Sequence, residues 1–288
     1  MAVYKRSYKP YVGPLTAISR RWLVVARFSL ATAFSSRISV VAFVLCMVPP
    51  LIAALIIYIA NNELVQAAMQ VKSSGALLIN NRFFVIFLEI QSWLALFLTA
   101  WIGPATITPD LSNNALPLFL SRPLSRLEYI AGKLLALAGV LSAVTWVPLL
   151  LLFTLQSQLS KTAWFTENWY MLPGIFFGCW LWIAVLALVS LAVSSWVKWR
   201  IIATGATIAI LMVPAGFGGV INGVLRTRWG FLLNVPYLMT LIWTDLLRVP
   251  LPLQAVPVPL AWVAMLSTAA LSLLLLTRRI QARQVVRG

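Results

Sequence analysis

Six long stretches of the chain are apolar and almost free of charged side chains, and this pattern constrains the fold more than any other feature. Four of them cover residues 38–60, 83–106, 201–222 and 256–277, and the other two lie within 133–161 and 167–198. Each exceeds the roughly 17 residues that are needed to cross the hydrocarbon core of a membrane. We expect each stretch to be a helix, because a helix satisfies its own backbone polar groups in lipid.

The charge content agrees with a membrane protein. Only 10% of the 288 residues are charged, against about 25% in soluble domains, which excludes a free-standing soluble protein and a disordered chain. The sequence therefore predicts an all-α membrane protein with six transmembrane helices in one domain, residues 38–277. Residues 1–37 and 278–288 are expected to be cytoplasmic, and no cleavable signal peptide is expected.

The distribution of basic residues predicts the orientation. The formal net charge is +16, but the basic residues lie at the ends of apolar stretches, which favours membrane topology and contact with membrane lipids over nucleic acid. With six spans, most of the 22 Lys and Arg residues fall on the side of the two termini. The exceptions are Lys72, Arg82, Lys161, Arg226, Arg228 and Arg248. The positive-inside rule then places both termini in the cytoplasm and the protein in the cell inner membrane.

Several chemistries are absent from the sequence. The chain has no histidine and no G-x-x-x-x-G-K-[ST] motif, and its two cysteines lie singly in apolar stretches. Histidine-based catalysis, nucleotide hydrolysis by a P-loop and a metal centre are therefore not expected. Six scattered acidic residues also argue against an intramembrane enzyme. The sequence predicts a non-catalytic subunit without a cofactor of its own.

An amphipathic helix is predicted before the first span, over residues 15–34. Leu15, Ile18, Trp22 and Val25 share one helical face, and Arg20 and Arg27 lie opposite. This pattern is typical of a helix in the membrane interface. The alternative is a solvated basic arm.

The connection between the second and third spans, residues 103–133, is too long for a turn. Asp110 is expected to cap and open a short helix, which Pro123 ends, and Ser125 or Arg126 is expected to begin the third span. Exposed apolar residues on this short helix, Leu116, Leu118 and Phe119 among them, predict a docking surface for a cytoplasmic partner.

Two further features lie elsewhere in the chain. Residues 237–247 are apolar but too short to span, which favours a re-entrant or interfacial hairpin on the outer side over an ordinary surface loop. Glu89 is a carboxylate inside the second span, and such residues are functional candidates by default. The alternative is a structural pair with a neighbouring basic group near the outer surface, where Arg82 lies seven residues earlier.

Residues 103–137, GPATITPDLSNNALPLFLSRPLSRLEYIAGKLLAL, resemble the signature region of ABC-2 type transporter permeases. The matching positions are Asp110, Asn113 or Asn114, Leu116, Leu118, Leu120, Ser121, Arg122, Pro123, Ser125, Arg126, Glu128, Tyr129, Gly132 and Lys133. The amphipathic lead-in, the six spans and the outer hairpin extend the resemblance along the chain.

The resemblance implies the membrane subunit of an ATP-binding-cassette transporter that exports a hydrophobic or amphipathic substrate. Two such chains, or this one with a paralogue, form the path, and two separate ATPase subunits hold the ATP and Mg. Residues 110–122 are implied to be the coupling helix that docks on the ATPase. Its implied docking residues are Asp110, Asn113, Asn114, Leu116, Leu118, Phe119 and Arg122. Arg20, Trp22 and Arg27 are implied to contact the ATPase or the inner leaflet.

Two other functions remain open. One is a non-transporting permease that passes ATPase motion to another membrane complex, and the other is a structural subunit of such a complex. A neighbouring reading frame that encodes a P-loop ATPase with an ABC signature would favour the transporter family over the structural subunit.

Overall fold

The computed structural model describes residues 17, 20–68, 79–113, 125–160, 163–251 and 256–280. Every regular element in these ranges is a helix. In chain order the helices are α1 (Arg21–Ala33), α2 (Arg37–Cys46), α3 (Val48–Asn61), α4 (Glu63–Ala68), α5 (Asn81–Ser112), α7 (Arg126–Val144), α8 (Trp146–Leu159), α9 (Trp164–Asn168), α10 (Met171–Trp196), α11 (Arg200–Leu225), the 3₁₀ helix η3 (Trp229–Leu233), α12 (Val235–Leu246) and α13 (Val258–Arg279).

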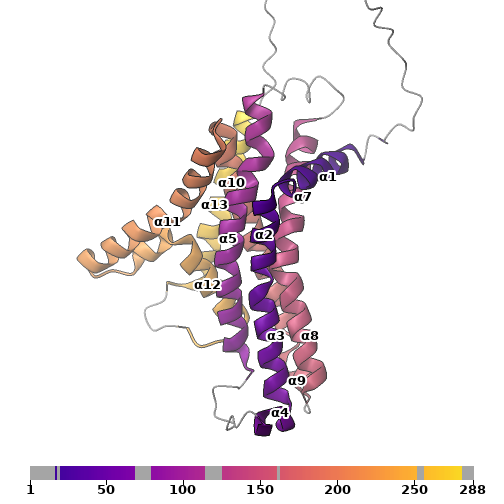
Figure 1. The fold of residues 1–288 in the computed structure, drawn as a ribbon. Helices are drawn as coiled ribbons and strands as arrows, with labels where there is room; N and C mark the ends of the chain where they lie inside the picture. Colours follow the sequence, from indigo (N-terminus) through magenta and orange to yellow (C-terminus); the bar gives the residue numbers. More distant parts are fainter. Residues whose placement is uncertain are drawn as a thin grey trace, which may run out of the picture.

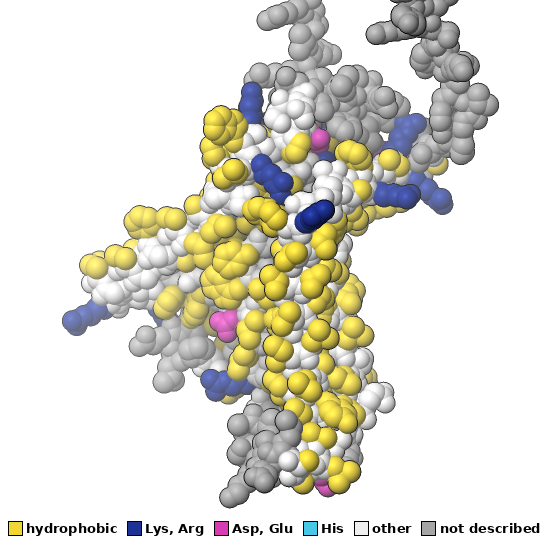
Figure 2. Space-filling model, in the orientation of Figure 1, with side chains coloured by type: hydrophobic (Ala, Val, Ile, Leu, Met, Phe, Trp, Pro, Cys, Tyr) yellow, Lys and Arg dark blue, Asp and Glu magenta, His cyan; other side chains and the backbone are white. Residues whose placement is uncertain are grey.

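Six helical segments of the described chain are long and apolar enough to cross a membrane. They are α2 with α3, α5, α7 with α8, α10, α11 and α13. The prediction of an all-α protein with six candidate spans is therefore confirmed, and the chain is a multi-pass membrane protein. Figure 2 shows the wide hydrophobic surface that a soluble protein of this size does not carry.

Helix α10 forms the centre of the bundle and packs against α5, α7, α12 and α13 (Figure 1). Its glycines permit close approach: a Cβ at Gly178 would lie 2.7 Å from the Trp243 ring of α12. Trp182 of α10 and Trp243 meet edge to face, with ring centroids 6.2 Å apart, and both are almost fully buried. Most of the short apolar stretch at 237–247 thus forms helix α12, which packs on the bundle and is not a surface loop.

Helix α11 packs on the bundle over only part of its length. It begins beside α5 and α10 and then leans away from them (Figure 1). Its buried residues are only Ala203, Thr207, Leu211 and Gly218. Most of the apolar surface of α11 therefore faces outward.

Prolines interrupt two of the spans. The sequence predicts a kink at Pro49 and Pro50 of the first span, and the helix breaks beside them, at Met47. The third span breaks at Thr145, whose ψ angle is −91° and which lies three residues before Pro148. Proline removes a helical hydrogen bond and clashes with the preceding turn, so the nearby prolines explain both breaks.

The second span does not end where the sequence predicts. We expected it to stop near residue 106 and Asp110 to cap a new helix, but α5 continues through Pro104 and Pro109 to Ser112. The prediction that Asp110 opens a helix is wrong, because Asp110 lies in the last turn of α5. Contacts with α7, described below, hold this turn in place.

One end of the bundle is rich in basic side chains, and we call it the basic end. Helix α7 begins there, α10 ends, α11 begins and α13 ends, and it includes Arg126, Lys198, Arg200, Arg278 and Arg279. Figure 2 shows several Lys and Arg side chains gathered around this end, above the hydrophobic surface. Helices α4 and α9 lie at the opposite end (Figure 1).

Candidate functional site

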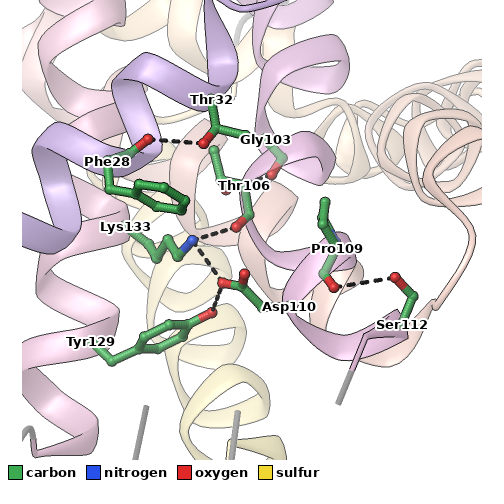
Figure 3. A network of polar contacts seen from close by, with 9 residues as sticks. All are labelled: Phe28, Thr32, Gly103, Thr106, Pro109, Asp110, Ser112, Tyr129 and Lys133. Carbon is green, nitrogen blue, oxygen red and sulfur yellow. Dashed lines mark hydrogen bonds and ion pairs between the residues drawn. The ribbon is translucent and has the colours of Figure 1, made fainter. Parts of the chain in front are cut away.

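A buried ion pair joins α5 and α7 at the basic end. The Lys133 Nζ lies 2.8 Å from Asp110 Oδ2, and the two side chains are 3% and 13% exposed. The Tyr129 hydroxyl donates to the same Asp110 oxygen over 2.7 Å, and Lys133 Nζ also donates to the carbonyl oxygen of Thr106. Figure 3 shows these four residues converging between the two helices.

The spacing on each helix explains the convergence. Tyr129 and Lys133 are four residues apart on α7, and Thr106 and Asp110 are four apart on α5. Residues four apart lie on the same helical face, so each helix presents two polar groups to the other. A charge buried without a partner is expensive, and here the ammonium group and the carboxylate compensate each other. The cluster therefore fixes the last turn of α5 against the first turns of α7.

Helix α1 covers this junction. A Cβ at Gly132 of α7 would lie 2.7 Å from the backbone oxygen of Trp22 and 2.7 Å from Val25 Cβ. The glycine therefore allows the two helices to touch at backbone distance. Figure 3 shows Phe28 and Thr32 of α1 beside the Lys133 side chain. We call Asp110, Tyr129 and Lys133, with the α1 contact at Gly132, the basic-end junction.

The structure places the predicted residues of α1 as follows. Trp22 is half-buried against α7, and Arg27 and Arg20 are exposed, with Arg20 at the N-terminus of the helix. The helix that we predicted is present over Arg21–Ala33, and Leu15 and Ile18 lie outside the described residues. Its outward face carries exposed Leu23, Val24 and Phe28. The face predicted to be apolar, with Trp22 and Val25, packs instead against Gly132 of α7.

The predicted docking residues divide into two groups. Asp110 lies in the junction, and Asn113 is exposed directly after α5. The others lie outside the described residues: Asn114, Leu116, Leu118, Phe119 and Arg122. The chain returns at Ser125, whose hydroxyl accepts from the Glu128 backbone N–H while the Glu128 carboxylate accepts from the Ser125 N–H over 2.6 Å. This capping box confirms the predicted start of the third span.

Gln91 is a buried polar residue that the sequence analysis missed. Its Nε2 donates to the carbonyl oxygens of Cys46, over 2.8 Å, and of Val144, over 2.7 Å. Each of these oxygens lies four residues before a proline, Pro50 and Pro148, which has no N–H to offer. Gln91 thus supplies from α5 the two donors that the prolines remove. A glutamine inside an apolar stretch, with prolines in two other stretches, is the signal that could have found it.

Glu89 lies at a separate pocket nearer the opposite end. The pocket has a volume of about 580 Å³, and Glu89, Asn81, Arg82 and Arg248 contribute to its lining. No basic group of the described residues lies within ion-pair distance of Glu89, so the structural pair with Arg82 that we considered does not form. Arg248 adopts a left-handed backbone conformation, φ 54°, with its guanidinium 4.0 Å from the centre of the Tyr170 ring.

The described residues contain no cluster of metal-binding side chains. No group of three or more His, Cys, Asp or Glu side chains in these ranges could hold a metal ion. The polar groups of the junction are instead engaged with one another. Such an arrangement can hold helices together and transmit force between them.

No family model matches the chain, and no curated protein matches it either.

Proposed function

We propose that the chain is the transmembrane permease subunit of an ABC-2 type ATP-binding-cassette transporter, which couples ATP hydrolysis in separate ATPase subunits to export of a hydrophobic or amphipathic substrate. The motif at residues 103–137 supports this proposal, as do the six candidate spans. Both features are general to the family and leave the substrate open.

The observation that carries the proposal is the basic-end junction. Residues 114–124, the greater part of the proposed coupling helix, leave α5 after Asn113 and rejoin the chain at Ser125 before α7. The Lys133–Asp110 ion pair joins α5 and α7 within one turn of Asn113 and about two turns from Ser125. A displacement of the segment therefore acts on both helices together.

The proposed mechanism follows from this connection. ATP binding closes two ATPase subunits beneath a dimer of permease chains, or this chain with a paralogue. The closing subunits displace the two coupling helices, and the junctions pass that displacement to α5 and α7. Access to the path between the chains then changes from the cytoplasm to the outside. The ATP and Mg stay in the ATPase.

The proposal includes an orientation. The basic end faces the cytoplasm of the inner membrane with both termini, and η3 with α12 forms the outer hairpin, in re-entrant or interfacial contact. The excess of Lys and Arg at the basic end supports this orientation. Arg20, Trp22 and Arg27 then lie where the ATPase or the inner leaflet can contact α1.

The test is co-purification with the ATPase encoded by a neighbouring reading frame. Leu118→Asp and Phe119→Asp place a charge on the apolar surface of the proposed coupling helix and are expected to abolish association while leaving membrane insertion intact. Leu64→Asp is the matched control, because Leu64 is 82% exposed on α4 at the opposite end. Undiminished co-purification of both coupling-helix variants would contradict the assignment.

A further inference from the structure

An apolar groove opens between α10, α11 and α13 on the side of the bundle from which α11 leans away. Its volume is about 570 Å³. All three helices line it. Helix α10 contributes Val189 and Trp196, α11 contributes Ala206 and Ile210, and α13 contributes Leu275 and three further residues. No charged side chain of the described residues contributes to its wall.

The groove is short enough to lie within a single membrane leaflet. On α10 it extends from Trp196, the last residue of the helix, to Val189. On α13 it extends over the same number of residues, from Leu275 to Thr268. Seven residues of helix correspond to roughly 10 Å, and half of the hydrocarbon core is about 15 Å. The groove therefore begins at the basic end and stops before the middle of the membrane.

Several basic residues lie at the basic end, near the end of the groove. Lys198 and Arg200 lie in and after the short α10–α11 connection, and Arg278 and Arg279 end α13. Arg279 is joined to the groove directly: its guanidinium lies 5.0 Å from the centre of the Trp196 ring, and its Nε donates to the Ser195 carbonyl over 3.3 Å. Trp196 itself lines the groove.

These cations lack acidic partners. None of the six acidic residues lies in α10, α11, α13 or the α10–α11 connection. Arg200 is directed toward α5, where its guanidinium lies 5.0 Å from the centre of the Trp101 ring, so Arg279 is the cation that the structure joins to the groove. Phosphate oxygens are strong hydrogen-bond acceptors for arginine.

We infer that this groove is a binding site for an anionic phospholipid of the leaflet at the basic end, with an acyl chain between α10, α11 and α13 and the phosphate against Arg279. An apolar wall within one leaflet, with a basic side chain at its end, matches both halves of such a lipid. The lipid fills the space that α11 leaves as it leans outward. The inference rests on membrane insertion alone and not on the proposed ATPase partner.

The test is native mass spectrometry of the full chain, delipidated in detergent and titrated with palmitoyl-oleoyl phosphatidylglycerol or with phosphatidylcholine of the same acyl chains. We expect the anionic lipid to be retained and the zwitterionic one to be lost at lower collision energy. Arg279→Gln is expected to weaken phosphatidylglycerol binding about fivefold, the equivalent of one basic residue at a lipid surface. Arg126→Gln, an exposed arginine of α7 at the same end, is expected to have no effect.

A second pair of variants tests the groove. Ala206→Trp fills it, whereas Ala209→Trp adds the same side chain to an exposed position one turn away on α11. We expect only Ala206→Trp to lose the lipid and the thermal stabilisation that bound lipid confers. Equal retention of both lipids, or wild-type binding by Ala206→Trp and Arg279→Gln, would overturn the inference. So would a change from dimer to monomer in Ala206→Trp alone, since a second copy of the chain would then occupy the groove.

Discussion

The Nε2 atom of Gln91 lies 2.7 Å from the carbonyl oxygen of Val144, an oxygen whose usual helical donor is replaced by Pro148. The same nitrogen is 2.8 Å from the Cys46 carbonyl, four residues before Pro50. One side chain of α5 therefore stabilises the breaks in two neighbouring spans. The breaks are tolerated because a third helix supplies the missing hydrogen bonds.

Gln91→Leu is expected to lower the free energy of unfolding by about 1–3 kcal/mol, because two buried carbonyl oxygens lose a donor. The measurement is thermal unfolding of the purified protein in detergent. Gln158→Leu, at an exposed position of α8, serves as the control. In a Pro148→Ala background, where residue 148 regains its N–H, the effect of Gln91→Leu should shrink. An undiminished effect there would disagree with the proposed compensation.

Lys133→Met is expected to destabilise the protein by about 3–5 kcal/mol, because it leaves the Asp110 carboxylate buried without its cation. The double variant Asp110→Asn/Lys133→Met should be less destabilised than Lys133→Met alone, since no buried charge remains. Denaturant titration in mixed micelles measures both. Lys198→Met, at an exposed position of the basic end, should be near neutral, and equal losses in the single and double variants would argue against the ion pair.

Gly132→Val should separate α1 from α7, because a side chain at residue 132 collides with Trp22 and Val25. Trypsin is then expected to cleave after Arg27 faster than in the wild-type protein, at a cost in stability of about 1–3 kcal/mol. Timed digestion with mass spectrometry follows the cleavage. Gly139→Val is the matched control, since a Cβ at Gly139 of the same helix meets open space. Similar cleavage rates in the two variants would mean that α1 is not held at Gly132.

The orientation can be measured with single cysteines in intact cells. Cys46 and Cys179 are buried and should give little background labelling. With an impermeant maleimide, Thr227→Cys beyond α11 is expected to be labelled and Lys198→Cys at the basic end is not, because the positive-inside rule places the basic end in the cytoplasm. Permeabilised cells should label both. The reverse pattern in intact cells would invert the proposed topology.

The spans were predictable because their signal is local. A helix in lipid needs a long run of apolar residues, and each of the six stretches supplies one without reference to the others. Pro49 and Pro50 marked the break at Met47 for the same reason. The end of α5 was not predictable in this way. Helix α5 passes Pro104 and Pro109 and ends at Ser112, where contacts with α7 hold its last turn.

The candidate site depends on contacts between helices. Asp110 and Lys133 are visible in the sequence as one acid and one base, but their pairing requires the packing of α5 on α7. Gln91 stands out as a glutamine inside an apolar stretch, but its partners could not be predicted locally, because they are backbone atoms 45 and 53 residues away. Gly132 is likewise explained only by the backbone of α1. The sequence therefore indicated where helices lie but not which polar groups join them.

The uninterrupted course of α5 has a consequence for the far side of the membrane. At 1.5 Å per residue, its 32 residues extend roughly 48 Å, longer than the whole bilayer with its headgroups. Asn81, at its beginning, donates to the Tyr170 hydroxyl and to the Leu247 carbonyl. A tilt of α5 near Asn113 would therefore strain these two hydrogen bonds. In this way a displacement at one membrane surface would reach the other surface through a single continuous helix.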